Sequence, residues 1–436
     1  LHRTPIGGRN FECMSEDPLL TGVLARAYVE GVQSQGVACC IKHFIGNDTE
    51  YERSTISSEI DERTLREVYL LPFEMAVEQN VQAVMTAYNK LNGTFCADHE
   101  WLITTVLRNE WGFDGVVISD WFGLHSTAEA INAGLDIEMP GPTRHRGHLL
   151  ESAVNEGVVD SARIEASVAR VRALAEWAQA SKSDGSERTE DDAVTRDVQY
   201  RAAVGSTVLL TNDTNQLPWP AQSGDRIALI GPYASTGRPQ GGGSAKVRPS
   251  WVASLLESLN SRDHRVDWAQ GCSISRFHPS VRGEFTLDVV DEHGVSVSLT
   301  KTSLDAFWQD GPTDEMSMTF GATMSGIFTP ETSGQWSLGC RSVGECRIAI
   351  DGEEVLVISP GDAGGSMFGH GSPERSVNIE LVAGRSVEIT VDYPIDDHPG
   401  IRGFMVGLQE PQHTDLFAEA VELAAASDRA LVVVGT

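Results

Sequence analysis

The chain has 436 residues, which at roughly 150 residues per domain corresponds to about three domains. Its apolar content of 41% is enough for several packed cores and excludes a disordered chain. Lys and Arg number 33 against 62 Asp and Glu, so the formal net charge is −29. A chain this acidic is not expected to bind nucleic acid or an anionic membrane. No apolar run approaches the roughly 18 residues of a membrane span, and a neutral or cationic partner is favoured.

Residues 1–180 alternate short apolar runs with helical patterns. The apolar runs are Val37–Ile41, Val84–Tyr88 and Val116–Ser119, and helical periodicity marks Leu65–Glu78, Trp101–Glu110 and Ser126–Ala133. This alternation, with continuous apolar strands, predicts a parallel sheet buried on both faces. A TIM-like barrel and a doubly wound sheet both fit. Within the first run, Cys39 and Cys40 are interpreted as core residues, because free cysteine is commonly buried.

The composition changes three times after residue 180. Residues 181–193 are almost wholly polar and predict an exposed linker. An α/β pattern occupies residues 194–271, and β-branched runs separated by Gly, Asp and Ser turns occupy residues 272–411. Helical periodicity and a strand return in residues 412–436. The sequence therefore predicts an all-β module that interrupts an α/β domain.

Both ends of the chain have the pattern of internal segments. The sequence begins with Leu1 and has no signal-peptide pattern there. It ends at Leu431–Thr436, which reads as a buried strand reaching a turn. We therefore expect a fragment cut at both ends. A cytoplasmic or a secreted location, and a homo-oligomer of the full-length protein, are left open.

Polar side chains stand where the three apolar runs of the first segment end. They are Lys42-His43, Tyr88-Asn89 and Asp120-Trp121. Strand ends gather catalytic groups in parallel α/β folds, which predicts a pocket here, although a structural role for any single residue stays open. A carboxylate kept ionised by nearby cations, many hydrogen-bond donors and an indole face suit the cleavage of a glycosidic bond.

Around these residues the sequence resembles glycoside hydrolase family 3, the β-glucosidase family. The motifs that carry the resemblance are Gly8-Arg9-Asn10-Phe11-Glu12, Lys42-His43-Phe44, Met85-Thr86-Ala87-Tyr88-Asn89, Val117-Ile118-Ser119-Asp120-Trp121 and Ala133–Gly141. Downstream, Val208–Asn212 and Leu217-Pro218 resemble the start of that family's second domain. The resemblance implies part of a TIM-like (β/α) barrel in residues 1–180, followed by a partial α/β/α sandwich.

The all-β module resembles the PA14 domain. Gly326–Gly334 and Arg347–Glu353 carry this second resemblance. It implies a β-sandwich that contacts longer substrates or shapes the rim of the pocket, and a purely structural role is left open. Whether Cys340 and Cys346 form a disulfide is also left open.

The family resemblance implies a role for each residue of the expected site. Asp120 stands at the position of the nucleophile that forms a covalent glycosyl-enzyme. Arg9, Lys42, His43 and Arg53 match sugar-binding residues, Tyr88 matches a residue near the nucleophile, Trp121 matches the aglycone side, and Ser244 matches a second-domain residue that reaches the sugar. Glu12, Asp48 and Glu50 are interpreted as acids that pair with Arg or Lys. No metal and no cofactor are expected.

The resemblance predicts a retaining β-glucosidase that acts on terminal non-reducing β-D-glucosyl residues of a β-glucoside or oligosaccharide. The family's acid/base Glu and an early barrel Asp are expected outside this chain, so the chain alone is predicted to be inactive. Asn47 disfavours a β-N-acetylglucosaminidase, and Trp121 favours a glucosidase over a β-xylosidase or another exo-β-glycosidase. A phosphorylase and a non-catalytic carbohydrate-binding protein remain as alternatives.

Overall fold

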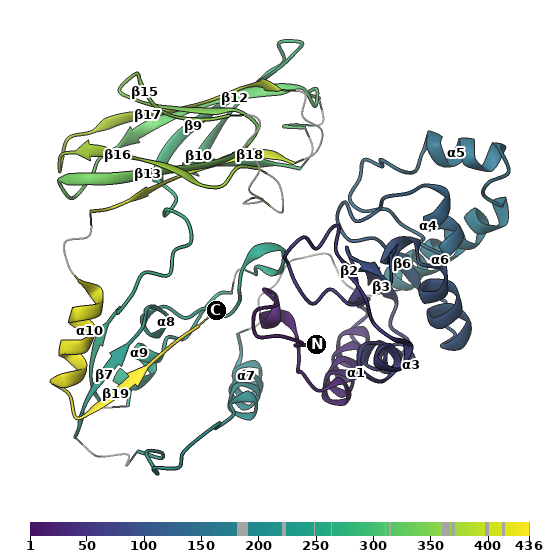
Figure 1. The fold of residues 1–436 in the computed structure, drawn as a ribbon, viewed down its shortest axis with the longest axis horizontal. Coiled ribbons are helices and arrows are strands. Elements are labelled where there is room, and N and C mark those ends of the chain that lie inside the picture. The colour runs from purple at the N-terminus through teal and green to yellow at the C-terminus, as the bar shows by residue number, and fades with distance from the viewer. Residues whose placement is uncertain are drawn as a thin grey trace. The chain divides into compact units, whose positions relative to one another are not determined.

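The computed structural model describes residues 1–180, 191–219, 224–247, 249–262, 264–309, 311–313, 315–359, 367, 371–396, 401–411 and 415–435. They form two compact units, Leu1–Asn212 with Pro239–Trp251 and Asp213–Arg238 with Val252–Thr436 (Figure 1). Most of the predicted linker, residues 181–190, lies outside the described residues.

The first unit is built on a parallel sheet of three strands. These are β1 (Cys40–Phe44), β3 (Ala83–Thr86) and β6 (Val116–Ile118), in the order β1-β3-β6. The parallel pairing follows the sequence prediction. Burial on both faces holds for β3 and β6 but not for β1, whose residues are partly exposed, because no described strand pairs with its other edge. Cys40 is accordingly exposed, so its interpretation as a core residue is wrong, whereas half-buried Cys39 packs against the core.

The helices of this unit precede the first strand of the sheet, lie between its strands or follow the last strand in the sequence. They are α1 (Pro18–Gln33), α2 (Glu62–Thr64), the π-helical η2 (Leu65–Leu70), α3 (Leu71–Glu78), the π-helical η4 (Trp101–Glu110), α4 (Ala128–Ala133), α5 (His148–Asn155), α6 (Ser161–Gln179) and α7 (Ala193–Ser206). Helix α7, which comes last, is exposed along nearly all of its length. Helix α1 begins where Asp17 accepts a hydrogen bond from the Leu20 N–H at 2.9 Å, with Pro18 in the first turn. The apolar core between sheet and helices includes Phe44, Val84 and Leu102.

Short elements extend the strand ends of the first unit. The 3-10 helix η1 (Asn10–Glu12) precedes α1, and η3 (Cys96–Asp98) follows a small sheet of β2 (Ser57–Ser58), β4 (Lys90–Leu91) and β5 (Thr94–Phe95). The 3-10 helix η5 (Gly243–Ala245) lies in the segment Pro239–Trp251. A Cβ added at Gly241 would approach the Phe11 ring to 2.4 Å, so glycine is needed where this segment packs beside η1.

The second unit contains a parallel sheet of three strands. Its members are β7 (Arg226–Ile230), β8 (Arg265–Ala269) and β19 (Arg429–Val432), in the order β19-β7-β8. The helices α8 (Pro232–Ser235), α9 (Leu255–Asn260) and α10 (Leu416–Ala425) accompany it. Strands β7 and β19 pair in this sheet, and the β-rich residues lie between these two strands in the sequence. The β-rich segment therefore interrupts the α/β part of the chain.

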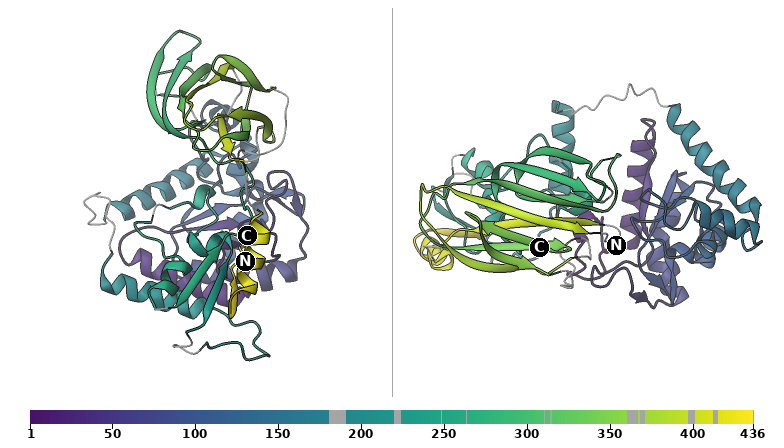
Figure 2. Two further views of the ribbon diagram at one scale, coloured as in Figure 1. Left: turned by 90° about the vertical axis from the view of Figure 1, so that its left-hand side faces the viewer. Right: turned by 90° about the horizontal axis from the view of Figure 1, so that it is seen from above.

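Those β-rich residues form an antiparallel sandwich. Six strands, β9 (Arg282–Asp291), β10 (Ser296–Ser303), β12 (Phe320–Phe328), β14 (Cys346–Ile350), β15 (Glu353–Ile358) and β17 (Val387–Asp396), form one sheet in the order β10-β9-β12-β17-β14-β15. The other sheet has β11 (Asp305–Trp308), β13 (Gly334–Val343), β16 (Arg375–Leu381) and β18 (Arg402–Gln409) in the order β11-β18-β13-β16. Figures 1 and 2 show these strands as long arrows lying side by side. Apolar residues of both sheets meet in one core, and the specific likeness to PA14 stays a prediction.

Two cysteines lie in the core of the sandwich. Cys340 of β13 and Cys346 of β14 belong to different sheets, and both are fully buried. Their Sγ atoms are 3.9 Å apart and both thiols are free. The disulfide that the sequence left open is therefore not formed in this structure.

None of the helices in the described part of the chain is both long enough and apolar enough to cross a bilayer.

Candidate active site

The parallel sheet of the first unit brings the predicted strand-end residues together. Strand β1 ends with Lys42, His43 and Phe44, and Tyr88 and Asp120 each follow the end of a neighbouring strand. Because the carboxyl ends of parallel strands share one edge, these side chains meet there. The direct contact is between Nε2 of His43 and Oδ2 of Asp120, which are 3.3 Å apart.

Asp120 is a nearly buried carboxylate, with 8% of its surface exposed. Its Oδ1 accepts the Trp121 backbone N–H at 2.7 Å. Its Oδ2 is buried and lacks a well-formed hydrogen bond from any described residue. Burial raises the pKa of Asp120, and the Trp121 N–H, the Tyr88 hydroxyl and nearby cations work in the opposite direction. The site therefore holds a carboxylate with one oxygen oriented by the backbone and the other available.

His43 is a neutral imidazole. Burial lowers its pKa to about 2, and the positive charges of Arg9, Lys42 and Arg53 act in the same direction. A neutral ring beside Asp120 supplies a hydrogen-bonding group without adding charge.

The three cations around this pair are each held by a described contact. Arg9 Nε donates to Oε1 of Glu12, and Lys42 Nζ lies 3.7 Å from Oε2 of the same carboxylate. Arg53 donates to Glu50 at 2.5 Å, and its guanidinium lies 4.6 Å from the centre of the Tyr88 ring. The expectation that Glu12 and Glu50 pair with cations is confirmed.

Asp48 and Asn89 have structural contacts instead of contacts with the cations. Asp48 accepts a hydrogen bond from the Tyr69 hydroxyl at 2.5 Å, so its predicted pairing with Arg or Lys is wrong in this structure. The buried Asn89 amide donates to the Ile45 carbonyl at 3.1 Å and the Lys90 carbonyl at 3.0 Å. Asn89 thus fixes the chain just after β1 and β3, which holds their ends in place.

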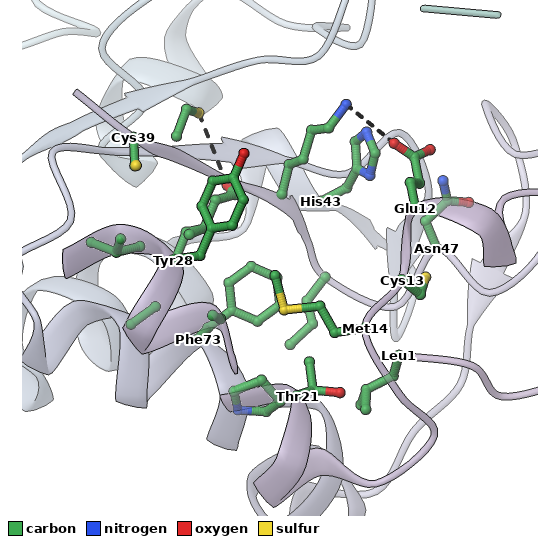
Figure 3. Close-up of a pocket in the computed structure, with 18 of the residues that line it drawn as sticks. Leu1, Glu12, Cys13, Met14, Thr21, Tyr28, Cys39, His43, Asn47 and Phe73 are labelled. Atoms are coloured by element: carbon green, nitrogen blue, oxygen red, sulfur yellow. Dashed lines mark hydrogen bonds and ion pairs between the residues drawn. The ribbon is translucent and has the colours of Figure 1, made fainter. Parts of the chain in front are cut away.

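A cavity of about 630 Å³ opens beside this cluster. Its polar wall includes Arg9, Glu12, Lys42 and His43, and its lining includes apolar side chains such as Phe73. Figure 3 shows Glu12 and His43 on one side of the cavity and Phe73 and Met14 on the apolar part of its wall. The cavity reaches His43 but not Asp120, Tyr88, Arg53 or Trp121.

Two of the predicted site residues make no side-chain hydrogen bond, ion pair or ring contact with the other described residues of the cluster. Ser244 is exposed on η5. Trp121 is half-buried, and it hydrogen-bonds Asp120 through its backbone N–H. Of the eight predicted residues, the structure gathers six, namely Arg9, Lys42, His43, Arg53, Tyr88 and Asp120.

One member of the cluster was not predicted as a site residue. Glu12 was expected only to support a cation, yet it lines the cavity and contacts two of the cations. The spacing of three residues between Arg9 and Glu12 was visible in the sequence, whereas the contact with Lys42 requires the fold. Among the described residues, no group of three or more His, Cys, Asp or Glu is arranged to hold a metal.

Two sequence profiles match the chain. The Glycosyl hydrolase family 3 N terminal domain matches residues 1–174, and the Glycosyl hydrolase family 3 C-terminal domain matches residues 207–436. The second match covers more than half of the chain, so the chain belongs to glycosyl hydrolase family 3. The family resemblance of the motifs is thereby confirmed.

Curated relatives agree with this membership. A β-glucosidase of Rhizobium radiobacter is 42% identical over 454 residues, which covers 100% of this chain and 55% of that protein. A probable β-glucosidase I of Aspergillus niger is 35% identical over 467 residues, which covers 100% of this chain and 57% of that protein. The chain therefore spans just over half the length of these relatives.

Solved structures support a mixed α/β fold of several domains. The β-glucosidase from Kluyveromyces marxianus, solved with glucose, superposes with a TM-score of 0.84 at 30% identity and covers 100% of this chain and 56% of that one. The β-glucosidase 3B from Thermotoga neapolitana, solved with α-D-glucose, gives a TM-score of 0.57 at 37% identity and covers 61% of this chain and 38% of that one.

Proposed function

We propose that this chain carries the nucleophile and a large part of the sugar-binding site of a retaining β-glucosidase. Its substrates would be β-glucosides or oligosaccharides with a terminal non-reducing β-D-glucosyl residue. The proposal is supported by membership of glycosyl hydrolase family 3 and by relatives that are called β-glucosidases. The single observation that carries it is Asp120, with one oxygen held by a backbone N–H and the other unengaged beside neutral His43.

In the proposed reaction Asp120 acts twice. Its free oxygen attacks the anomeric carbon as the bond to the aglycone oxygen breaks and that oxygen takes a proton from the acid/base Glu expected outside this chain, which gives a covalent glycosyl-enzyme. Water, which gives its proton to the same Glu, then attacks that carbon from the side that the aglycone left, and the bond to Asp120 breaks. Two inversions give net retention at the anomeric carbon. The Trp121 N–H keeps the carboxylate in one orientation through both steps.

The surrounding residues are proposed to hold the sugar. Arg9, Lys42 and Arg53 offer charged donors for hydroxyl groups, and neutral His43 offers a further hydrogen bond. Tyr88 is proposed to orient Asp120, since its hydroxyl acts on the pKa of that carboxyl. Trp121 is proposed to line the aglycone side, and Ser244 to reach the sugar from its loop.

The sequence-derived domain boundaries and the PA14 likeness are part of the same proposal. The barrel part is assigned to residues 1–180, the α/β/α part to residues 194–271 and 412–436, and the PA14-like module to residues 272–411. The module is proposed to contact longer substrates, which a comparison of cellobiose with longer cello-oligosaccharides as substrates would test.

A mechanism-based label tests the nucleophile. The full-length protein is incubated with 2-deoxy-2-fluoro-β-D-glucosyl fluoride, whose fluoride leaves without protonation and whose glycosyl-enzyme turns over slowly. We expect one glycosyl adduct, located by peptide mass spectrometry on Asp120 and missing in Asp120→Asn. An adduct on another residue would show that the nucleophile is misassigned, and protein that remains unlabelled and inactive on aryl β-glucosides would refute the function. The corresponding xyloside reagent tests a β-xylosidase in parallel.

A further inference from the structure

The contacts of Glu12 point to a role for this residue beyond a surface ion pair. Its side chain is only 18% exposed, and its two carboxylate oxygens face different cations. Oε1 accepts a hydrogen bond from Nε of Arg9, and Oε2 lies 3.7 Å from Nζ of Lys42. One carboxylate therefore lies between two of the side chains proposed to hold the sugar.

These contacts join two separate pieces of the fold. Glu12 is the last residue of η1 and Arg9 directly precedes this helix, whereas Lys42 belongs to β1. Figure 3 shows Glu12 beside His43, with its ion pair drawn as a dashed line across the top of the cavity. Glu12 thus helps to hold η1 against the end of β1. The spacing of Arg9 and Lys42 depends on this contact.

The charges explain why a carboxylate is needed here. Arg9 and Lys42 repel each other, and besides Glu12 the carboxylates whose charge acts on Arg9 are Glu50 and Asp120. Without Glu12, Glu50 and Asp120 are the carboxylates left to attract the guanidinium, so the position of Arg9 relative to Lys42 would change. A glutamine would keep an acceptor for Arg9 but not the charge that attracts both cations.

We infer that Glu12 is a positioning residue, which sets the spacing of Arg9 and Lys42 for sugar binding. The inference rests on the proposed β-glucosidase function. Because Arg9 and Lys42 would hold hydroxyl groups in the bound substrate as well as in the transition state, loss of Glu12 is expected to raise KM more than it lowers kcat.

The test compares Glu12→Gln, Glu12→Asp and the control Glu16→Gln in the full-length protein. Glu16 is a nearby exposed acid with no ion pair among the described residues. The measurements are kcat and KM for 4-nitrophenyl β-D-glucopyranoside, with active enzyme counted by the fluoroglucosyl label, and the Kd of D-glucose from tryptophan fluorescence. We expect Glu12→Gln to raise KM and the glucose Kd about tenfold or more, Glu12→Asp to recover part of the loss, and Glu16→Gln to match wild type.

The outcomes separate the inference from the function on which it rests. A merely structural role would lower the fraction of active enzyme and leave KM unchanged, and that result overturns the inference. Equal constants for Glu12→Gln and Glu16→Gln overturn it as well, while wild-type turnover leaves the function standing. Wild-type protein that neither turns over the glucoside nor binds glucose overturns the proposed function, and the inference with it.

Discussion

Nε2 of His43 lies 3.3 Å from Oδ2 of Asp120, and both side chains are nearly buried. The contact is not an ordinary salt bridge, because burial and three neighbouring cations lower the pKa of His43 to about 2. The charge balance of Asp120 therefore comes from Arg9 and Lys42, not from the imidazole. Around this pair the cations Arg9, Lys42 and Arg53 are matched by the carboxylates Glu12, Glu50 and Asp120, so the site is locally balanced within a chain whose formal net charge is −29.

This relationship predicts which group controls activity at low pH. Burial raises the pKa of Asp120 above its ordinary value. As the pH is lowered, kcat/KM should therefore begin to fall at a higher pH than it would if the aspartate were exposed. His43 is already neutral between pH 3 and pH 8, so its titration should not contribute to the pH dependence of kcat/KM. His43→Gln should lower kcat/KM about ten- to a hundredfold, because the buried hydrogen-bonding group that His43 is proposed to offer the sugar is lost, and the fall of kcat/KM at acidic pH should remain. Measurement of kcat/KM between pH 3 and pH 8 checks this prediction. If the fall of kcat/KM at acidic pH disappears in His43→Gln, the controlling group is His43 instead of Asp120.

Asp120→Asn should separate activity from stability. In the full-length protein, loss of the proposed nucleophile should lower kcat by at least about 10⁴-fold. The folded-state pKa of Asp120 is raised, so its ionised form destabilises the fold at any pH above that pKa. The variant should therefore melt at an equal or higher temperature at pH 7, and the difference should vanish below the pKa of Asp120 in the unfolded chain. Thermal unfolding at pH 7 and pH 3, with kcat on an aryl glucoside, checks both parts, and a lower Tm at pH 7 would contradict the stability argument.

The cluster around Asp120 shows how far sequence reasoning reaches. Runs of apolar residues predicted three parallel strands, and their shared edge made the meeting of His43 and Asp120 predictable. The exposure of Cys40 was not predictable from an apolar run, because burial of a strand depends on its neighbours across the sheet. The contact of Glu12 with Lys42, and of Asp48 with Tyr69, depends on how η1 and η2 lie against β1, which no local pattern specifies.

A second carboxylate, Asp136, is predicted to be essential for stability. Its side chain is fully buried and accepts hydrogen bonds from Arg108 and Arg170, each with a nitrogen 2.8 Å away. It also accepts the Val117 N–H at 2.8 Å, so it links η4, β6 and α6. Because Arg108 would remain buried without a counter-charge, Asp136→Asn should lower the free energy of unfolding by about 3–5 kcal/mol.

Urea unfolding followed by circular dichroism measures that loss. Glu165→Gln, an exposed change on the same helix as Arg170, is the matched control and should stay within about 0.5 kcal/mol of wild type. If Asp136→Asn unfolds at the same urea concentration as the control, the buried ion pairs do not stabilise the first unit.

The last prediction concerns His278, which precedes the sandwich in sequence and lies on the outer face of its four-stranded sheet. Nδ1 of its ring is 2.6 Å from Oε2 of Glu374, and Nε2 is 2.8 Å from the Ser337 hydroxyl. The ring has room because residue 339 is a glycine, where a Cβ would come 2.6 Å from Nδ1. His278→Ala should therefore lower the free energy of unfolding by about 1–3 kcal/mol, since Glu374 and Ser337 both lose the imidazole, although Glu374 keeps the backbone N–H of residue 278 and Arg341.

A double-mutant cycle with Gly339→Ala shows whether this packing is the cause. In the wild-type background the added methyl group displaces His278 and should cost about as much as His278→Ala. In the His278→Ala background most of the clash is gone, so Gly339→Ala should cost much less, and the two changes should not be additive. Ser337→Ala, which removes one side-chain hydrogen bond, should cost about 0.5–1.5 kcal/mol. Additive losses in urea unfolding would show that His278 and Gly339 act independently, and that the ring does not fasten this segment to the sheet.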